Sequence, residues 1–483
     1  MNDDIAKLRA RYQIAHRHAN FGAVIRSLQI CGFRGIADLT INFDFPILAI
    51  SGLNGSGKST IAQLAVCAYK PPKTAVDYKR FYVAQFFPAS VADPSPFSAQ
   101  ARAVYTYEAN VATAPKEVTI SRAASEWSGY KRQLERYCYY IGFTLYIPKV
   151  ERRDMSVYSG KKLELKSKRD VSPEVAGKVG HILNQAYEDV HFQGVGHGVR
   201  QSELGILKRY GQQYSENNMG FGEGRVLHLV SLMEEAQQMS LFVLEEPETS
   251  LHEEAQYRLV QYLLDVCRRR NHQIIFSTHS SVMLEALPEE ARLLLYRDSG
   301  GVTAYKGISS TRARAILSGG EHRALTICVE DEFAKTVLRE LIRIEDSTLI
   351  KAVSIEAVGS NDAVREAVKL LTKLNRKAIG IRDGDTGAAP VENLFSLPGK
   401  KPPETEVFSS EAVSDRLISE FSLTKETMLA ATNGVEHHHL SEKLAELAEV
   451  EQAHLEGVAI REYVQHVDAT QRKKLIGIIT QHA

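Results

Sequence analysis

PILAISGLNGSGKS, at residues 46–59, is the most informative stretch of this sequence. Its apolar first part (46–50) predicts a short buried strand, and residues 52–59 fit the pattern G-x-x-x-x-G-K-[ST]. The glycines allow backbone N–H groups to curl around a phosphate, and the N-terminus of the next helix adds partial positive charge. Because residues 59–70 have helical character, the stretch predicts a phosphate-binding loop between a strand and a helix.

Two side chains of this loop have predicted roles in binding ATP. Lys58 is placed to reach the β- and γ-phosphates, and the Ser59 hydroxyl is placed to ligate Mg²⁺. The alternative, a glycine-rich turn without a ligand, is disfavoured by the full pattern and its context. The expected cofactors are therefore ATP and Mg²⁺. The expected ATP-binding residues are Asn54, Gly55, Ser56, Gly57, Lys58, Ser59 and Thr60.

Two later apolar runs also end in polar residues. LFVL (241–244) is followed by Glu245, Glu246 and Pro247, and QIIFST (273–278) is followed by His279. We expect Glu245 to hold Mg²⁺ and Glu246 to orient or deprotonate the attacking water. Alone, an acidic strand end or a single histidine is more often structural, but their order along the chain favours function. The predicted catalytic residues are Glu246, Lys58 and His279.

A glycine-rich loop at residues 218–225 opens a predicted helix at residues 225–239. Such a helix N-terminus can bind an anion, although a glycine-rich loop by itself is more often simply flexible. In order along the chain, the phosphate loop, this loop, the acid pair and the histidine resemble an ABC-type ATPase head, over about residues 20–300.

Within this class the sequence is similar to RecF/OLD-like heads. FRGI at residues 33–36 and EEPETSLH at residues 245–252 carry that resemblance. It implies that the signature loop of one subunit, with Gly220, Gly222 and Glu223, contacts ATP bound to the other, and hence a homodimer or higher oligomer. It also implies a metal contact from Gln85.

Three departures from the family pattern matter. The first acid is Glu245 where an aspartate is usual, and the signature loop lacks the usual serine. The insertion between Gly57 and Gly220 spans 220 − 57 = 163 positions, too few and too unpatterned for the long coiled-coil arms of SMC proteins.

A second α/β pattern begins near residue 324. Predicted strands at 324–330, 353–359 and 378–385 alternate with helices. Glu330, Asp383 and Asp385 stand at strand ends, where carboxylates can bind Mg²⁺ and activate water against a phosphodiester. The simpler alternative is a polar β–α loop.

The spacing of these acids resembles the Toprim arrangement of OLD-family nucleases, topoisomerases and primases. The second acid usual in OLD-like nucleases is missing, since its position is Ala334. A downstream acid–lysine pair is represented only by Glu404 with Lys400 or Lys401. Three successive histidines (437–439) cannot face one ion from a helix, so a polar loop or helix start is expected there.

The predicted fold class is α/β. We expect an ABC-type P-loop ATPase domain at 1–310, with an inserted subdomain at about 85–200. A smaller Toprim-like domain with an acidic helical tail would occupy 320–483. The loop LPGKKPPE (397–404) resembles a loop in ATPase-plus-Toprim proteins of bacterial defence, including OLD-like, retron-associated and Septu-system ATPases.

Composition adds limits to this interpretation. Lys plus Arg and Asp plus Glu each total 59, so the net charge is zero. Two segments depart from this balance. Residues 131–170 have a net charge of about +6 and are a candidate nucleic-acid face, and residues 403–456 have a net charge of about −9. No apolar run approaches the roughly 20 residues that span a bilayer. The acidic start and five scattered cysteines fit a cytoplasmic protein with reduced thiols.

Three functions remain open. The resemblance favours a dimeric ATPase of an anti-phage defence system that controls nucleic-acid cleavage by a partner nuclease or toxin through a degenerate Toprim-like domain. The first alternative is an OLD-type ATP-gated endonuclease that cuts DNA itself with a Mg²⁺-dependent Toprim site. The second is a RecF-like DNA-repair clamp, which would leave Asp383 and Asp385 unexplained.

Overall fold

The structure is a computed structural model of the whole chain, and it divides into two compact units, Met1–Ser310 and Thr311–Ala483. Each unit has its own sheets and core and is described separately below. The structure describes residues 1–75, 78–108, 114–123, 126–142, 146, 163–197, 200–318 and 322–483.

The first unit is built on a six-stranded sheet in which only the edge strand β15 runs antiparallel within the described residues. The strand order is β15-β14-β3-β13-β12-β7. Parallel strands buried on both faces read as apolar runs, as β3, β12 and β13 do in the sequence. The strands are β3 (Ile47–Gly52), β7 (Cys138–Ile141), β12 (Leu241–Glu245), β13 (Gln273–Ser277), β14 (Arg292–Asp298) and β15 (Gly301–Lys306).

Helices cover this sheet. α3 (Lys58–Val66) contacts β12 and β13, and it shares a buried core with Leu241, Val243 and Ile275. Alternate strand residues such as Phe242 and Phe276 point to the other face, where they are also buried. The remaining helices of this unit are α1 (Asn2–Arg11), α2 (Ile14–Phe21), α4 (Val83–Phe86), α6 (Pro173–Leu183), α7 (Phe221–Glu235), α8 (Glu253–Arg270) and α9 (Ser281–Glu285).

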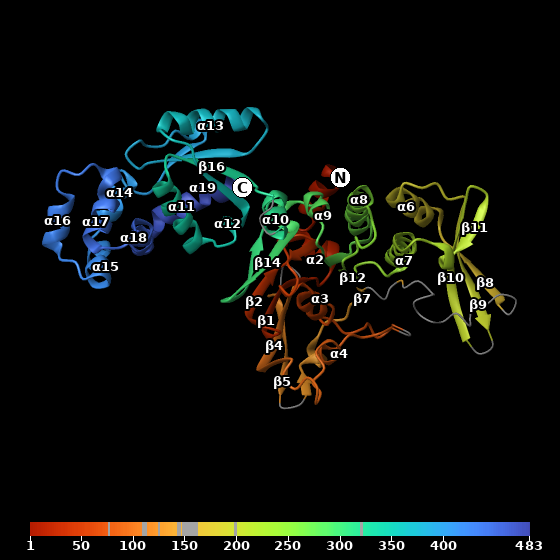
Figure 1. The fold of residues 1–483 in the computed structure, drawn as a ribbon. Helices are drawn as coiled ribbons and strands as arrows, with labels where there is room; N and C mark the ends of the chain where they lie inside the picture. The colour runs from red at the N-terminus through yellow and green to blue at the C-terminus, as the bar shows by residue number, and fades with distance from the viewer. Residues whose placement is uncertain are drawn as a thin grey trace. The chain divides into compact units, whose positions relative to one another are not determined.

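Two antiparallel sheets complete the first unit, with strand orders β2-β1-β4-β5-β6 and β11-β10-β9-β8 (Figure 1). Residues 85–200, expected as one inserted subdomain, therefore contribute strands to three different sheets. The strands are β1 (Ile25–Phe33), β2 (Ile36–Asn42), β4 (Phe97–Tyr107), β5 (Lys116–Ala123), β6 (Glu126–Ser128), β8 (Glu164–Asp170), β9 (Asp189–His197), β10 (Arg200–Arg209) and β11 (Gln212–Ser215).

The second unit contains a four-stranded parallel sheet with the order β17-β16-β18-β19. The strands are β16 (Leu325–Val329), β17 (Val353–Ala357), β18 (Ala378–Arg382) and β19 (Leu394–Ser396). The helices are α10 (Ser310–Leu317) at the boundary, α11 (Glu332–Glu345), α12 (Leu349–Ala352), α13 (Asn361–Lys373), α14 (Pro403–Phe408), α15 (Glu411–Phe421), α16 (Lys425–Thr432), α17 (Leu440–Ala448), α18 (Gln452–His466) and α19 (Ala469–His482).

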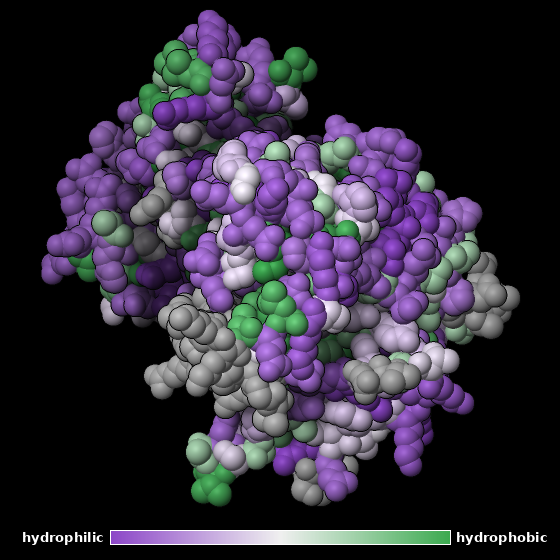
Figure 2. Space-filling view, turned by 90° about the vertical axis from the view of Figure 1, so that its right-hand side faces the viewer, coloured by the Kyte–Doolittle hydropathy of each residue, from purple (hydrophilic) through white to green (hydrophobic). Residues whose placement is uncertain are grey.

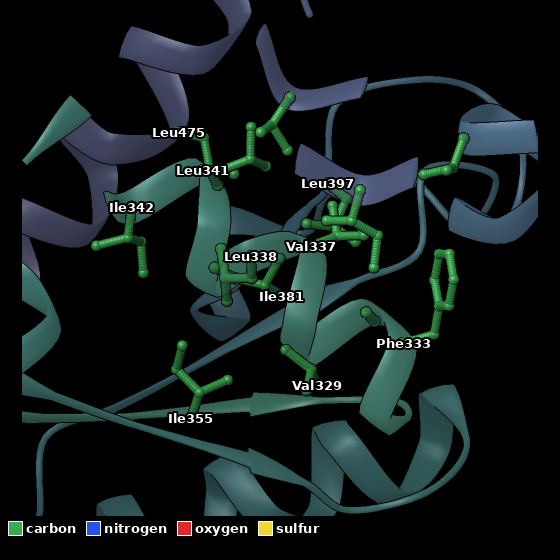
Figure 3. Close-up of a cluster of buried hydrophobic side chains, with 14 of the residues drawn as sticks. Val329, Phe333, Val337, Leu338, Leu341, Ile342, Ile355, Ile381, Leu397 and Leu475 are labelled. Atoms are coloured by element: carbon green, nitrogen blue, oxygen red, sulfur yellow. The ribbon is translucent and has the colours of Figure 1, made fainter. Parts of the chain in front are cut away.

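The acidic tail belongs to the core of this second unit. Figure 3 shows Val337, Leu338 and Leu341 of α11 close to strand residue Ile381 and to Leu475 of α19. α11 carries this core because its apolar residues recur every three to four positions along one face. The tail helices therefore help to hold α11 in place, and α11 begins directly beside the carboxyl end of β16.

Figure 2 shows a face of the molecule on which hydrophilic residues predominate and hydrophobic residues form small separate groups. Among the described residues, no helix combines the length and the apolar character needed to cross a bilayer. All five cysteines are buried as thiols.

Candidate functional site

The phosphate loop runs from the end of β3 to the start of α3. Gly57 adopts a φ of 105°, in the left-handed region that favours glycine, and it precedes the first residue of α3. Gly52 has a φ of 150°, and a Cβ there would lie 2.5 Å from the Leu295 carbonyl oxygen. The glycines of the motif are therefore required by a tight turn against β14.

The side chain of Lys58 folds back into this loop. Its ammonium donates to the carbonyl oxygens of Gly52 at 2.9 Å and Leu53 at 3.1 Å. Burial lowers the pKa of Lys58, and the carboxylates of Glu246 and Glu248 oppose that shift. The other predicted ligands line the same turn: Asn54, Gly55 and Ser59 are exposed, whereas Ser56 and Thr60 are buried.

Arg297 holds the phosphate loop, and Arg34 lies beside Arg297. Arg297 on β14 donates to the carbonyl oxygen of Gly55 at 2.8 Å and to that of Arg34 at 3.0 Å. Arg34 is exposed beside the loop, donates to the Phe86 carbonyl oxygen at 2.8 Å, and stacks over the ring of Phe87 at 4.5 Å. Arg297 tethers the loop across 242 positions of sequence, which no local motif signals.

The register of the parallel sheet brings the predicted acids to this loop. Glu245 is paired with Ser277, and Ser277 with Ile50, so β12, β13 and β3 end at one edge. Glu245 is 8% exposed, and one of its carboxylate oxygens is buried without a hydrogen-bond partner in the described part of the chain. The same is true of the buried hydroxyl of Ser56. A hard cation and a phosphate are the ligands that such groups accept, so the site fits Mg²⁺·ATP.

Glu246 and His279 face each other at the ends of β12 and β13. Their closest side-chain atoms, Oε1 and Nε2, are 3.6 Å apart. Glu246 has a φ of 43°, and its N–H donates to the Ser277 carbonyl oxygen at 3.1 Å. Burial and the nearby Lys58 ammonium lower the pKa of His279, against the opposing effect of Glu246. A neutral imidazole beside a carboxylate can orient water at a γ-phosphate.

Glu248 is a site residue to which sequence reasoning gave no role. Its Oε1 accepts a hydrogen bond from the Thr278 hydroxyl at 2.6 Å and one from the His279 N–H at 2.9 Å. Burial is the main reason that the pKa of Glu248 is raised. The residue thus fixes the backbone from which His279 projects. Its place in the EEPE stretch is the only signal that the sequence offered.

The predicted signature loop forms the N-terminus of α7. Gly220 caps this helix with a φ of −62°, and a Cβ there would meet no atom within 4 Å. A Cβ on Gly222 would lie 2.5 Å from the Ser250 carbonyl oxygen. The carboxylate of Glu223 accepts hydrogen bonds from the hydroxyls of Tyr187 at 2.7 Å and Tyr214 at 2.9 Å. Within a single chain, Glu223 therefore has a structural role.

Gln85 lies exposed on the short helix α4. Its amide oxygen accepts a hydrogen bond from the N–H of Tyr82 at 3.1 Å and so caps its own helix. The neighbouring Phe86 carbonyl connects this helix to Arg34 beside the phosphate loop. The described contacts thus place α4 beside Arg34 near the phosphate loop. They do not show Gln85 at the site where Mg²⁺ would bind with ATP.

The second unit gathers acids at the carboxyl edge of its sheet. Glu330 follows β16 and Asp383 follows β18, and the N–H of Asp383 donates to Glu330 Oε1 at 3.2 Å. Asp383 is 8% exposed with one oxygen unpartnered. Burial, followed by the charges of Glu330, Asp331, Glu404 and Asp385, raises the pKa of Asp383 to about 7. Mutual repulsion of this kind is relieved by a divalent cation.

The structure shows the surroundings of three further residues at this edge. Ala334, the position where OLD-like nucleases usually have a second acid, lies on α11 and is fully buried in the core. Asp331 is instead the acid at the start of α11, and its side chain caps the N–H of Ala334 at 2.7 Å. Glu404, which the sequence suggested as one member of an acid–lysine pair, is 3% exposed. Its charge helps to raise the pKa of Asp383.

The predicted basic face at residues 131–170 is only partly described, because residues 147–162 lie outside the described part of the chain. On β8, Arg169 pairs with Glu203 at 2.9 Å and with Glu235 at 2.7 Å. Lys168 pairs with Asp170 at 2.7 Å. In the described segment much of the positive charge is therefore neutralised by neighbouring acids.

Comparisons with known proteins agree with the nucleotide site. A family model described as an AAA ATPase domain matches residues 156–284, and one described as an AAA domain matches residues 27–72. These segments contain the phosphate loop, the signature loop, the acid pair and His279. No curated protein matches the chain.

Solved structures of SMC heads are among the similar folds. The SMC head domain from Thermotoga maritima is 16% identical, with a TM-score of 0.34, over 59% of this chain and 98% of that one. The Smc head with an extended coiled coil bound to the C-terminal domain of ScpA, from Pyrococcus furiosus, is 14% identical, with a TM-score of 0.38, over 61% and 99%. Two segments of the first unit thus match models of AAA-type ATPase domains, and the geometry of the phosphate loop fits an ATP site.

Proposed function

We propose that the chain is a Mg²⁺-dependent ATPase that works as a homodimer and whose ATP cycle controls nucleic-acid cleavage at a Toprim-like acidic centre in its second unit. The observation that carries the cleavage part is the group of acids at one sheet edge, where the pKa of Asp383 is raised to about 7. The resemblance to OLD-like, retron-associated and Septu-system ATPases supports a role in defence against phage.

In the ATPase unit each side chain has a separate task. Lys58 would leave the carbonyl oxygens of its own loop and donate to the β- and γ-phosphates. Ser59 and Glu245 would hold Mg²⁺, which neutralises charge on the phosphates when it is bound. Glu246 would take the proton of the attacking water, while His279, held by Glu248, would hydrogen-bond the γ-phosphate.

A dimer would complete the site. The N-terminus of α7 offers backbone N–H groups beside Gly220, where nothing within 4 Å would meet a Cβ. Glu223 is held by two tyrosines, so the contact with the partner's ATP would fall to the backbone of Gly220 and its neighbours. ATP would then favour the closed dimer, and hydrolysis would favour the open state.

In the second unit, the acids Glu330, Asp383 and Asp385 would bind one or two Mg²⁺ ions and so activate a water molecule against a phosphodiester. The intact group of Glu330, Asp383 and Asp385 at one sheet edge favours a centre that cuts DNA itself.

The second candidate is control of a separate nuclease or toxin by a degenerate domain. Ala334 supports it, since this residue is packed in the core and has no acidic side chain. In that case the acidic edge and the tail would dock a partner, and the chain would hydrolyse ATP without cutting nucleic acid.

The deciding experiment is Mg²⁺- or Mn²⁺-dependent cleavage of DNA by the purified full chain, with and without ATP. An Asp383→Ala/Asp385→Ala variant should lose cleavage and keep ATP hydrolysis. Glu366→Ala, which alters an exposed carboxylate on α13, is the matched control and should cut normally. Cleavage that persists in the double variant would disprove the assigned centre, and no cleavage by any of the proteins would favour the partner-controlling function.

A further inference from the structure

A histidine pair from the tail lies against the acidic edge of the second unit. The 3₁₀ turn η8 (His437–His439) precedes α17, and the rings of His437 and His438 have centroids 3.9 Å apart. His438 Nδ1 lies 3.1 Å from Glu404 Oε1. One ligand atom from each of His437, His438 and Glu404 lies within 4.8 Å of the other two. The expected loop or helix start is thus correct, and His438 also has a carboxylate partner in Glu404.

Glu404 gives this cluster an unsatisfied buried ligand. The residue is 3% exposed, and its Oε2 has no hydrogen-bond partner among the residues that the structure describes. A buried carboxylate oxygen left without a donor costs about 1–3 kcal/mol or more, so such groups are normally paired or bound to a cation. His438 satisfies only the other oxygen.

A fourth candidate ligand lies near the same ring nitrogen of His438 that contacts Glu404. Asp331 Oδ2 is 4.0 Å from His438 Nδ1, and Asp331 begins the helix that follows β16. The cluster therefore joins three separate segments of the chain: the start of α11, the start of α14 and the turn η8. Imidazole nitrogens and carboxylate oxygens are both ligands that Zn²⁺ accepts in proteins.

We propose that Glu404, His437 and His438, with Asp331 as a fourth ligand, bind a divalent transition metal ion such as Zn²⁺. Two imidazoles and a carboxylate suit Zn²⁺ and related ions, whereas Mg²⁺ prefers oxygen ligands alone. The ion would replace the contact between His438 and Glu404 and satisfy the buried Oε2. It would also fix the turn η8 against the acidic edge that contains Asp383.

The test is metal binding by the full chain, freed of metals with a chelator, in the absence of ATP and nucleic acid. Equilibrium dialysis against Zn²⁺ gives the number of ions bound per chain, and the absorption of bound Co²⁺ reports nitrogen ligation. A His437→Ala/His438→Ala variant should bind one Zn²⁺ fewer per chain than the unaltered protein. Glu404→Gln, which keeps the shape of the side chain, should lose the same ion.

His439 provides the matched control, since it follows directly in sequence but pairs with Glu442 at 3.0 Å. His439→Ala should bind as many Zn²⁺ ions as the unaltered chain. The proposal is overturned if the double variant loses no ion, because His438 and Glu404 would then form only an ion pair. It is also overturned if His439→Ala loses the same ion. Circular dichroism of each variant excludes loss of fold as the cause. Because no cleavage is measured, the result is independent of the nuclease proposal.

Discussion

Glu246 combines an unusual backbone with an accessible carboxylate. Its positive φ of 43° follows from the tight exit of β12, where its N–H is bound to Ser277. We expect Glu246→Gln to bind ATP normally and to hydrolyse it at least about 100-fold more slowly, the scale of a lost general base. Phosphate release and binding of a fluorescent ATP analogue measure the two effects. Lys58→Ala, by comparison, should lose ATP binding, and a normal rate in Glu246→Gln would show that another group takes the proton.

Glu248 should act through His279 and not on ATP directly. Glu248→Ala removes the acceptor of two hydrogen bonds that hold the backbone at His279, and it should lower the hydrolysis rate about tenfold, or by about 1.4 kcal/mol of transition-state stabilisation. The KM for ATP should change much less than kcat. Glu248→Gln retains an amide oxygen at this position, so it should restore most of the rate. Equal losses in both variants would instead indicate that the charge itself is needed.

Asp383 should make the stability of the second unit depend on pH. Its pKa rises from the usual 3.8 to about 7, so the folded chain holds this proton more tightly than the unfolded chain. The contribution is full below about pH 4 and is lost as pH rises to about 7, by at most about 4 kcal/mol at 1.4 kcal/mol per pKa unit. Asp383→Asn should flatten this dependence and raise the unfolding midpoint at pH 8.

The comparison uses thermal unfolding with a chelator present, at pH 5 and pH 8. Glu366→Gln, on the exposed face of α13, should show the same pH dependence as the unaltered chain. If Asp383→Asn also retains it, other carboxyls must carry the effect.

At the scale of elements, the packing of α7 depends on Gly224, which has no side chain. A Cβ on Gly224 would lie 2.4 Å from the ring of Tyr146, whose hydroxyl donates to the Glu216 carbonyl oxygen. Gly224→Ala should therefore destabilise the first unit by about 1–3 kcal/mol, the usual cost of overpacking, despite the higher helix propensity of alanine. Differential scanning calorimetry would detect this as a lower unfolding temperature.

Gly177 on α6 is the matched control, because a Cβ there would meet nothing within 4 Å. Gly177→Ala should stabilise the protein by about 0.5–1 kcal/mol, since a helical glycine costs that much relative to alanine. If both variants behave alike, the ring of Tyr146 moves aside at no cost.

The elements that sequence predicted are those with a strong local pattern. β3, β12 and β13 are apolar runs. β3 ends at Gly52, the first residue of the phosphate-loop motif, β12 ends at Glu245, and β13 ends at Ser277, two residues before His279. β8 has no such signal because its residues ELKSKRD are mostly exposed on both faces. Contacts such as Arg297 with Gly55 could not be predicted, since they join residues 242 positions apart.

The same limit explains the histidines. The sequence showed three adjacent imidazoles and no partner, because the partner Glu404 lies 34 positions earlier than His438 and reaches it only once the tail helices pack on α11. The sequence singled out Glu404 only as one member of an acid–lysine pair, and not as a partner of the histidines. Burial, which no motif encodes, separates it from the other tail acids.

At the scale of the whole molecule, the zero net charge is the sum of basic and acidic segments that cancel. Basic side chains of β8 are balanced by their neighbours Glu203, Glu235 and Asp170, while the acids of the second unit converge at one sheet edge. A nucleic acid approaching that edge would be repelled unless cations are bound, so the activity of this unit should follow the metal concentration closely.

Assembly of the chain into dimers should depend on bound ATP. If the signature loop of one chain closes on the ATP of another, Glu246→Gln with Mg²⁺·ATP should shift the protein to a dimer or larger species in light scattering, whereas the chain without ATP should not. Gly220→Glu, added to Glu246→Gln, should abolish that shift, because it places a negative charge where the partner's phosphates would lie. The monomer should tolerate the change, since Gly220 has a φ of −62° and open space around its Cβ. An unchanged unfolding temperature and unchanged ATP binding would verify this, and Gly220→Ala should still dimerise. An ATP-dependent dimer that survives Gly220→Glu would show that the chains meet through another surface.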